Sequence, residues 1–215
     1  MATVKKAKRK AKTPALRAAP IQERAVQTRE RLLDIAGELL GEVGIERIST
    51  NMIAAQAGVS PAALYRYFKD KYAVLEALGR RLMDRQNAVL FAWIEEHKAG
   101  GLDALSEGTE ALLRATAEIT DSEPGGVWIL RAMRAVPQLA HVRLESHNEV
   151  TDALLEAYAP LLPKMNKRVL WRRLRMTVEF GYAVDEMLHD DDRFSRNEIL
   201  RDAAHLLSTS SLEDK

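Results

Sequence analysis

The chain has 215 residues, of which 47% are hydrophobic and 29% charged, so it can bury the core of one domain or of two small ones. It has no cysteine, which excludes disulfides, thiolate metal sites and cysteine nucleophiles. No apolar run approaches the length of a membrane span, and the first residues lack the apolar core of a signal peptide, so we expect a cytoplasmic protein without membrane contact.

The net charge of +1 hides an uneven distribution. Residues 1–72 hold 14 lysines and arginines against 7 acids, a net charge of +7, whereas the remaining residues hold 18 against 24, a net charge of −6. The N-terminal third is therefore the part that suits a polyanionic partner.

The basic excess is concentrated in residues 1–20, where no acid precedes Glu23 and large apolar residues are scarce. We expect a disordered basic arm there. One interpretation is a solubilising tail, and the other is an arm that follows phosphates or enters the minor groove of DNA. The basic residues of this segment are Lys5, Lys6, Lys8, Arg9, Lys10, Lys12 and Arg17.

The pattern of residues 28–72 predicts three short helices, with a start or stop signal at each end. The first is predicted to stop at Gly44, and Ser49 or Thr50 can cap the second, which has Ile53, Ala54 and Ala57 at helical spacing. The apolar residues of the first helix recur every three or four positions: Leu32, Leu33, Ala36, Leu39, Leu40 and Val43.

Gly58 allows a tight turn after the second helix, and Ser60 with Pro61 begins the third. On the third helix, Leu64 and Phe68 lie one turn apart and can pack on the first helix. The other side of the third helix presents Ala62, Tyr65 and Arg66. This spacing is typical of a helix-turn-helix DNA-binding unit.

The rest of the chain predicts further helices and no strands. Asp70 can cap a long helix, and Ser195 with Glu198 matches a capping box. The predicted helices cover residues 71–97, 102–119, 127–136, 139–159, 166–189 and 195–208. The fold class is therefore predicted to be all-α, with about nine helices.

The segments TRERLLDIAGELLGEVG and IAAQAGVSPAALYRYFKDKYAVLEAL closely resemble the N-terminal domain of the TetR family of bacterial transcriptional regulators. The resemblance implies a DNA-binding domain over residues 21–72 and a helical effector-binding and dimerisation domain over residues 73–215. It also implies a homodimeric repressor that binds a pseudopalindromic operator in double-stranded DNA and is released by a small molecule, without a cofactor.

The resemblance assigns DNA contacts to Thr50, Asn51, Pro61, Ala62, Ala63, Tyr65, Arg66, Tyr67 and Lys71. Lys71 and Tyr65 suit phosphate oxygens, whereas Arg66 can read a guanine and the alanines can contact a thymine methyl. A solvated arginine, or one that touches only phosphate, is the alternative for Arg66. Because the start of the third helix is poor in hydrogen-bonding side chains, DNA shape and the basic arm are expected to contribute to specificity.

Two apolar stripes on the last two helices indicate a dimer interface, in the resembling family a four-helix bundle shared by two subunits. The alternative is that both stripes face only their own core. The stripes consist of Leu170, Leu174, Thr177, Gly181, Val184 and Leu188 on one helix and of Ile199, Ala203, Leu206 and Leu207 on the other.

Aromatic residues, a methionine and a histidine in the C-terminal part are candidates for an effector pocket. Ordinary core packing is the alternative for each of them. The candidates are Phe91, Trp93, Trp128, Met133, His147, Tyr158, Phe180 and Tyr182.

Two other classes of protein compete with a regulator. An enzyme is disfavoured, because the five histidines are scattered and the chain has no metal-binding histidine pair, phosphate loop or nucleophile elbow. We therefore expect no catalysis and no bound metal. The second alternative is a helical ligand-binding or interaction protein without a specific operator.

Overall fold

A computed structural model describes residues 18–190 and 192–208, and over these residues the chain is all-helical, as predicted. Two 3₁₀ turns, Lys98–Gly100 and Pro137–Leu139, accompany the α-helices. The α-helices are α1 (Ala18–Arg47), α2 (Thr50–Gln56), α3 (Pro61–Leu64), α4 (Lys71–His97), α5 (Gly101–Glu107), α6 (Thr109–Ser122), α7 (Gly126–Ala135), α8 (Ala140–Tyr158), α9 (Lys167–Met187) and α10 (Arg196–Leu206).

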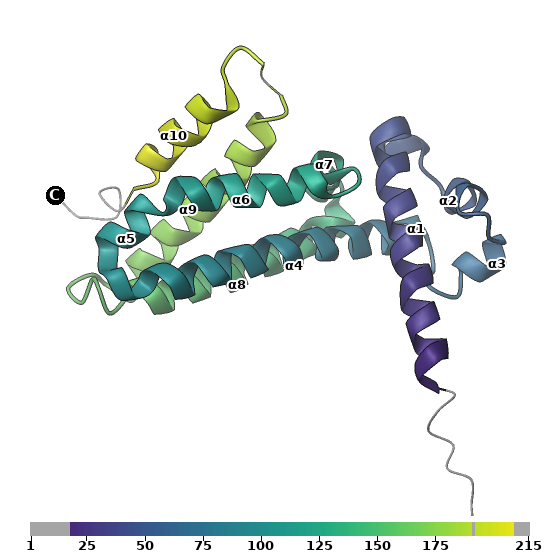
Figure 1. Cartoon of the computed structure of the whole chain (residues 1–215), viewed down its shortest axis with the longest axis horizontal. Helices are drawn as coiled ribbons and strands as arrows, with labels where there is room; N and C mark the ends of the chain where they lie inside the picture. Colours follow the sequence, from purple (N-terminus) through teal and green to yellow (C-terminus); the bar gives the residue numbers. More distant parts are fainter. Residues whose placement is uncertain (1–17, 191, 209–215) are drawn as a thin grey trace, which may run out of the picture.

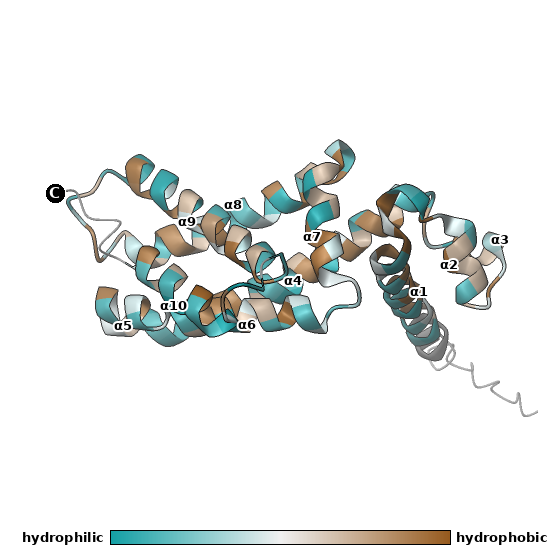
Figure 2. Cartoon of the chain, turned by 90° about the horizontal axis from the view of Figure 1, so that it is seen from above, coloured by the Kyte–Doolittle hydropathy of each residue, from teal (hydrophilic) through white to brown (hydrophobic). Residues whose placement is uncertain are grey.

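Figure 1 shows α1 standing across one end of the molecule, with α2 and α3 on its outer side and a bundle of helices on the other. The long helix α4 runs from this end through the bundle beside α6 and α8. Many of these helices carry hydrophobic residues on one side and hydrophilic residues on the other (Figure 2), as packing around shared cores requires.

Helix α1 starts earlier than predicted. It begins at Ala18, so residues 18–20 of the predicted arm are helical, and the rest of the arm lies outside the described residues. The backbone leaves helical geometry at Gly44, whose φ of 74° lies in the left-handed region that glycine tolerates. The predicted stop at Gly44 is therefore a kink, after which a last turn reaches Arg47.

The predicted capping residues form hydrogen bonds at the first turns of the helices that follow them. The Ser49 hydroxyl accepts a hydrogen bond from the Met52 amide, and the Ser60 hydroxyl accepts one from the Ala63 amide. The Asp70 carboxylate accepts one from Ala73 at 2.8 Å, at the start of α4. The capping box of Ser195 and Glu198 is also present. Each cap satisfies amides that the first turn of a helix leaves unpaired.

The first hydrophobic core extends beyond the three N-terminal helices. It joins Leu33, Leu40 and Leu64 of those helices to Leu78 of α4 and Ile129 of α7. A second core lies farther along the bundle, between α4, α5, α8 and α9, and a small third one between α6 and α10. The domain boundary predicted between residues 72 and 73 stays a prediction. The first core contains residues from both sides of it, so apolar packing continues across this boundary.

The single helix predicted over residues 102–119 is wrong, because α5 and α6 are separated at Gly108. The Trp93 indole donates a hydrogen bond to the Gly108 carbonyl at 3.0 Å, and a Cβ at Gly108 would lie 2.6 Å from atoms of Trp93 and His97. The residue at this break must therefore be small enough to let α4 approach.

The loop between α6 and α7 packs directly on α1. A Cβ on Gly37 would lie 2.1 Å from the Pro124 carbonyl oxygen, and one on Gly125 would lie 2.1 Å from the Gly37 oxygen. Glycine at both positions permits this backbone contact between α1 and the bundle.

Candidate nucleic-acid interface and internal cavity

The segment that begins with α3 has one buried and one exposed side. Leu64 and Phe68 are buried in the first core, as predicted, whereas the Tyr65 side chain is 51% exposed and Arg66 is also exposed. The α-helix itself ends at Leu64, and turn hydrogen bonds carry the chain on, the last from the Phe68 amide to the Leu64 carbonyl at 3.1 Å. Tyr65 and Arg66 therefore project from a backbone anchored on both sides.

The start of α2 lies beside this segment. The Thr50 and Tyr65 hydroxyls form a hydrogen bond of 3.1 Å, and Asn51 is exposed next to Thr50. Together with Pro61, Ala62 and Arg66, which are also exposed, these residues form a continuous set that we term the α2–α3 surface.

Four of the predicted contact residues are only partly exposed: Thr50, Ala63, Tyr67 and Lys71. Ala63 and Tyr67 are half-buried, and Tyr67 packs against the first core. The Lys71 ammonium donates a hydrogen bond to the Ile45 carbonyl at 3.2 Å, which ties α4 to the end of α1. A DNA phosphate at Lys71 would either replace the Ile45 carbonyl or accept a hydrogen bond from another proton of the same ammonium group.

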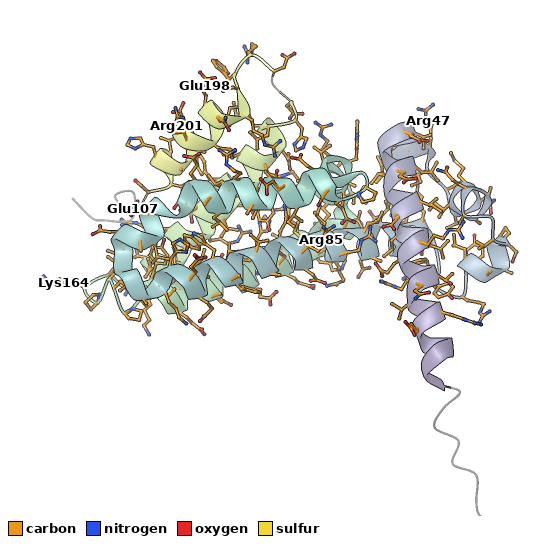
Figure 3. The ribbon with its side chains drawn as sticks, viewed as in Figure 1. Arg47, Arg85, Glu107, Lys164, Glu198 and Arg201 are labelled. Atoms are coloured by element: carbon orange, nitrogen blue, oxygen red, sulfur yellow. The ribbon has the colours of Figure 1, made fainter. Side chains whose placement is uncertain are left out.

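Two exposed basic residues near this surface were not among the predicted contacts. Lys69 follows Phe68, and Arg47 ends α1, next to α2 (Figure 3). Their charge was visible in the sequence, but their proximity to the α2–α3 surface depends on how the three helices fold together.

A cavity of about 100 Å³ lies between α4, α6, α8 and α9, next to Leu207 at the end of α10. Of the predicted pocket residues, Trp93, Tyr158 and Tyr182 line it. Most of the other lining side chains are aliphatic, including Leu90, Leu112, Val150, Leu154, Leu174 and Val178.

The other predicted pocket residues do not line this cavity. Phe91 lies on the other side of α4, near Ala153 and Glu156 of α8. Trp128 is 41% exposed, with the Arg131 guanidinium 4.8 Å from its ring centre. Met133 belongs to the first core, and Phe180 is 54% exposed on α9. Residue type alone did not indicate which neighbour each ring would face.

His147 is also placed differently from the prediction. It is fully buried, its ring stacks on Tyr182 at 4.1 Å between ring centres, and its Nδ1 lies 3.2 Å from Glu179 Oε1. Burial lowers the pKa of His147 to about 4, so the imidazole is neutral at pH 7, and in the tautomer with a proton on Nδ1 it donates a hydrogen bond to Glu179. His147 thus packs against Tyr182, which lines the cavity, but does not line the cavity itself.

The most informative cavity residues were missed in the sequence. Gln86 of α4 and Asp185 of α9 line the cavity and are 1% and 4% exposed. Gln86 and buried Thr120 of α6 both donate hydrogen bonds to Asp185 Oδ2. Because these residues come from three helices far apart in the chain, the sequence pattern gave no signal of their contact.

The N-terminal helices match a known family. Residues 32–78 match the model of the bacterial regulatory proteins of the tetR family. Over 47 residues, the chain is 47% identical to an HTH-type transcriptional regulator of Staphylococcus aureus, covering 22% of this chain and 25% of that protein. Over 78 residues it is 38% identical to the nucleoid occlusion factor SlmA of Pasteurella multocida, covering 36% and 37% of the two proteins.

Solved structures extend the similarity of fold to most of the chain. A putative transcriptional regulator from Pseudomonas aeruginosa superposes with a TM-score of 0.71 at 16% identity, covering 87% of this chain and 92% of that one. A putative TetR-family regulator from Mesorhizobium loti gives 0.65 at 15% identity, covering 88% and 96%. Residues 32–78 thus carry a segment of the TetR type, within a fold shared with solved TetR-family regulators. The matched segment spans only about a quarter to a third of the curated relatives, so similarity in sequence is confined to the TetR-type DNA-binding region.

The predicted dimer stripe on α9 faces the interior of its own subunit, so the structure favours the alternative of core packing for these residues. Leu170 and Leu174 are buried in the second core, Thr177 and Gly181 line the cavity, and Val184 and Leu188 are half-buried against the third core. On α10, Ile199 and Ala203 are buried, Leu207 lies near the cavity, and Leu206 is 67% exposed. The choice was ambiguous in the sequence, because α9 is apolar on two faces.

The second face of α9 is exposed. It carries Met176, Phe180 and Met187, which are 58%, 54% and 40% exposed, and Phe194 and Leu206 extend it toward α10. We term these five residues the α9–α10 apolar surface. Phe180, Met187, Phe194 and Leu206 line a groove with Glu198 and Arg201, which Figure 3 shows on α10.

A group of ion pairs joins α1 to the bundle. Arg81 of α4 pairs with Glu30 and Asp34 of α1 and with Glu123, which is 3% exposed after α6. Arg85, on the half of α4 nearer α1 in Figure 3, also pairs with Glu123. We term Arg81, Arg85 and Glu123, with their two partners on α1, the α1–α4 ion-pair cluster.

Within the described ranges, no helix combines the length and apolar character needed to cross a membrane. Nor do residues 18–190 and 192–208 bring three histidine, aspartate or glutamate side chains together as a group that could hold a metal ion.

Proposed function

We propose that the chain is a ligand-responsive transcriptional repressor that binds a pseudopalindromic operator as a homodimer. The observation that carries the proposal is the α2–α3 surface, on which Tyr65 and Arg66 project from a segment anchored by Leu64 and Phe68. A helix presented in this way fits the major groove, and a two-fold dimer presents two such helices to two half-sites.

The α9–α10 apolar surface is the proposed dimer interface, in place of the inward stripe. Monomeric proteins rarely expose several large apolar side chains side by side. Pairing of this surface about a two-fold axis would form a four-helix bundle from α9 and α10 of both subunits.

The cavity is the proposed effector site. Thr120, which contacts Asp185 beside the cavity, lies three residues before Glu123 of the α1–α4 ion-pair cluster. A ligand that shifts the end of α6 would therefore act on α1 through Glu123 and through the Pro124 contact with Gly37. Release of DNA requires that the ligand binds the DNA-incompetent arrangement more tightly.

A mobility-shift assay with the DNA upstream of the chain's own gene tests the proposal. The labelled fragment should stay bound in the presence of excess competitor DNA at two salt concentrations. Purely nonspecific binding with a steep salt dependence would favour the alternative, a helical ligand-binding protein without a specific operator.

Arg66→Ala is expected to weaken operator binding by roughly 1–3 kcal/mol and to relax the preference at one base pair in each half-site. The reason is that an exposed guanidinium can donate two hydrogen bonds to a guanine edge. Binding to operators substituted at each position measures this. Exposed Arg172 of α9 gives the matched control, Arg172→Ala, which should bind normally. An equal loss on every sequence would make Arg66 a phosphate contact.

Removal of residues 1–17 is expected to lower operator affinity and to flatten its dependence on salt. This segment holds seven lysines and arginines. The slope of log K against log salt changes by about 0.9 for each phosphate that the protein no longer neutralises. Titrations at several salt concentrations measure the slope. If the slope stays the same, the arm is a solubilising tail.

A further inference from the structure

The cavity of this chain combines an apolar wall with a single charge. Among the described residues that line it, Asp185 is the one with an ionisable carboxylate, and none is a lysine, arginine or histidine. Burial raises the pKa of Tyr158 to about 12 and also raises that of Tyr182, so both phenols stay neutral. The cavity therefore has no internal cation to balance Asp185.

Only one of the two carboxylate oxygens of Asp185 accepts hydrogen bonds. Its Oδ2 accepts hydrogen bonds from Thr120 Oγ1 at 2.6 Å and from Gln86 Nε2 at 3.1 Å, and both donors are neutral. Its Oδ1 is buried without a partner. Burial raises the pKa of Asp185, against the hydrogen bonds from Thr120 and Gln86, which lower it. A group that supplied positive charge at Oδ1 would stabilise the ionised carboxylate.

Gln86 adds a second free acceptor. Its amide nitrogen faces Asp185 Oδ2, the orientation that a carboxylate oxygen requires, and its Oε1 is buried without a partner. The neighbouring polar residue Asn87 is already paired, since it accepts from Ser146 and donates to Glu149. The unfilled hydrogen-bonding capacity of Gln86 and Asp185 thus consists of acceptors, which select a ligand with donors.

We propose that the cavity binds a small hydrophobic amine, whose ammonium group pairs with Asp185 Oδ1 and Gln86 Oε1 and whose hydrocarbon part lies among Trp93, Leu154 and Tyr158. An ammonium group supplies three donors and the missing charge. The volume of about 100 Å³ limits the hydrocarbon part to roughly one ring or a short chain. This inference rests on the proposed function only in making the amine the effector; amine binding itself does not depend on DNA.

Calorimetric titration of the full chain with benzylamine, benzyl alcohol and benzoate tests the ligand class. Benzylamine should bind roughly tenfold or more tightly than benzyl alcohol, and benzoate should not bind, because its charge repeats that of Asp185. Absence of benzylamine binding, or equal binding of the amine and the alcohol, would overturn the proposal. This comparison uses the unaltered chain, so it does not depend on the folding of a variant.

Asp185→Asn keeps the shape of the side chain and removes its charge. The preference for benzylamine over benzyl alcohol should disappear in this variant and persist in Asp84→Asn, which changes an exposed carboxylate on the same α4 helix that carries Gln86. Unchanged amine binding by Asp185→Asn would overturn the proposal. A mobility-shift assay with benzylamine then tests whether amine binding releases DNA. Benzylamine that binds the chain without releasing DNA would contradict the effector role, but it would still support the cavity as an amine site.

Discussion

A chain carrying Phe180→Glu is expected to be monomeric and to lose operator affinity by roughly 100-fold or more, since two linked half-site contacts become one. Phe180 is 54% exposed at the centre of the α9–α10 apolar surface, between Met176 and Met187. A carboxylate there would be buried without a partner in a dimer, whereas the monomer would leave it in water. Sedimentation and operator titration measure the two effects.

Leu144→Glu is the matched control for this substitution. Leu144 is 42% exposed on α8 and lies outside the α9–α10 apolar surface, so the same change of charge should leave the oligomeric state unaltered. A Phe180→Glu chain that remained dimeric would place the interface elsewhere. Monomers from both variants would indicate a general effect of added negative charge.

Gly37→Ala is expected to lower the free energy of unfolding by roughly 1–3 kcal/mol. The new Cβ would lie 2.1 Å from the Pro124 carbonyl oxygen, and backbone atoms on both sides must shift to relieve this contact. Because the shift moves the loop that holds Glu123, the ion pairs to Arg81 and Arg85 should weaken as well. Urea unfolding of the full chain measures the loss.

Gly41→Ala, one turn along α1, should instead raise the free energy of unfolding. The nearest atom to its Cβ would be Cδ1 of Trp128, at an ordinary contact distance of 3.5 Å. Replacement of a helical glycine by alanine then raises stability by about 0.5–1 kcal/mol. Equal effects at the two positions would show that α1 and the loop are not in the tight contact described above.

Local features of this chain could be predicted from the sequence. The caps at Ser49, Ser60, Asp70 and Ser195 depend on residues a few positions apart, and the structure has all four. The burial of one side of residues 61–68 followed from the spacing of Leu64 and Phe68, although the α-helix ends at Leu64 and turns complete the segment.

Features that join distant segments could not be predicted. Arg81 meets Glu30 and Glu123 across 51 and 42 residues of sequence, and Asp185 meets Gln86 across 99. The choice between the two apolar faces of α9 was ambiguous for the same reason. Leu170 and Phe180 are equally hydrophobic in kind, and only the positions of α6 and α8 decide that Leu170 faces inward.

Sequencing the genomic fragments that the full chain retains decides whether the α2–α3 surface reads DNA. The fragments should share an inverted repeat whose half-sites lie about one helical turn, or a multiple of it, apart. A chain with Tyr65→Ala and Arg66→Ala should retain no shared motif while keeping its fold and the oligomeric state of the unaltered chain. Fragments without a common sequence, or the same motif recovered by the double variant, would contradict a role of this surface in operator recognition.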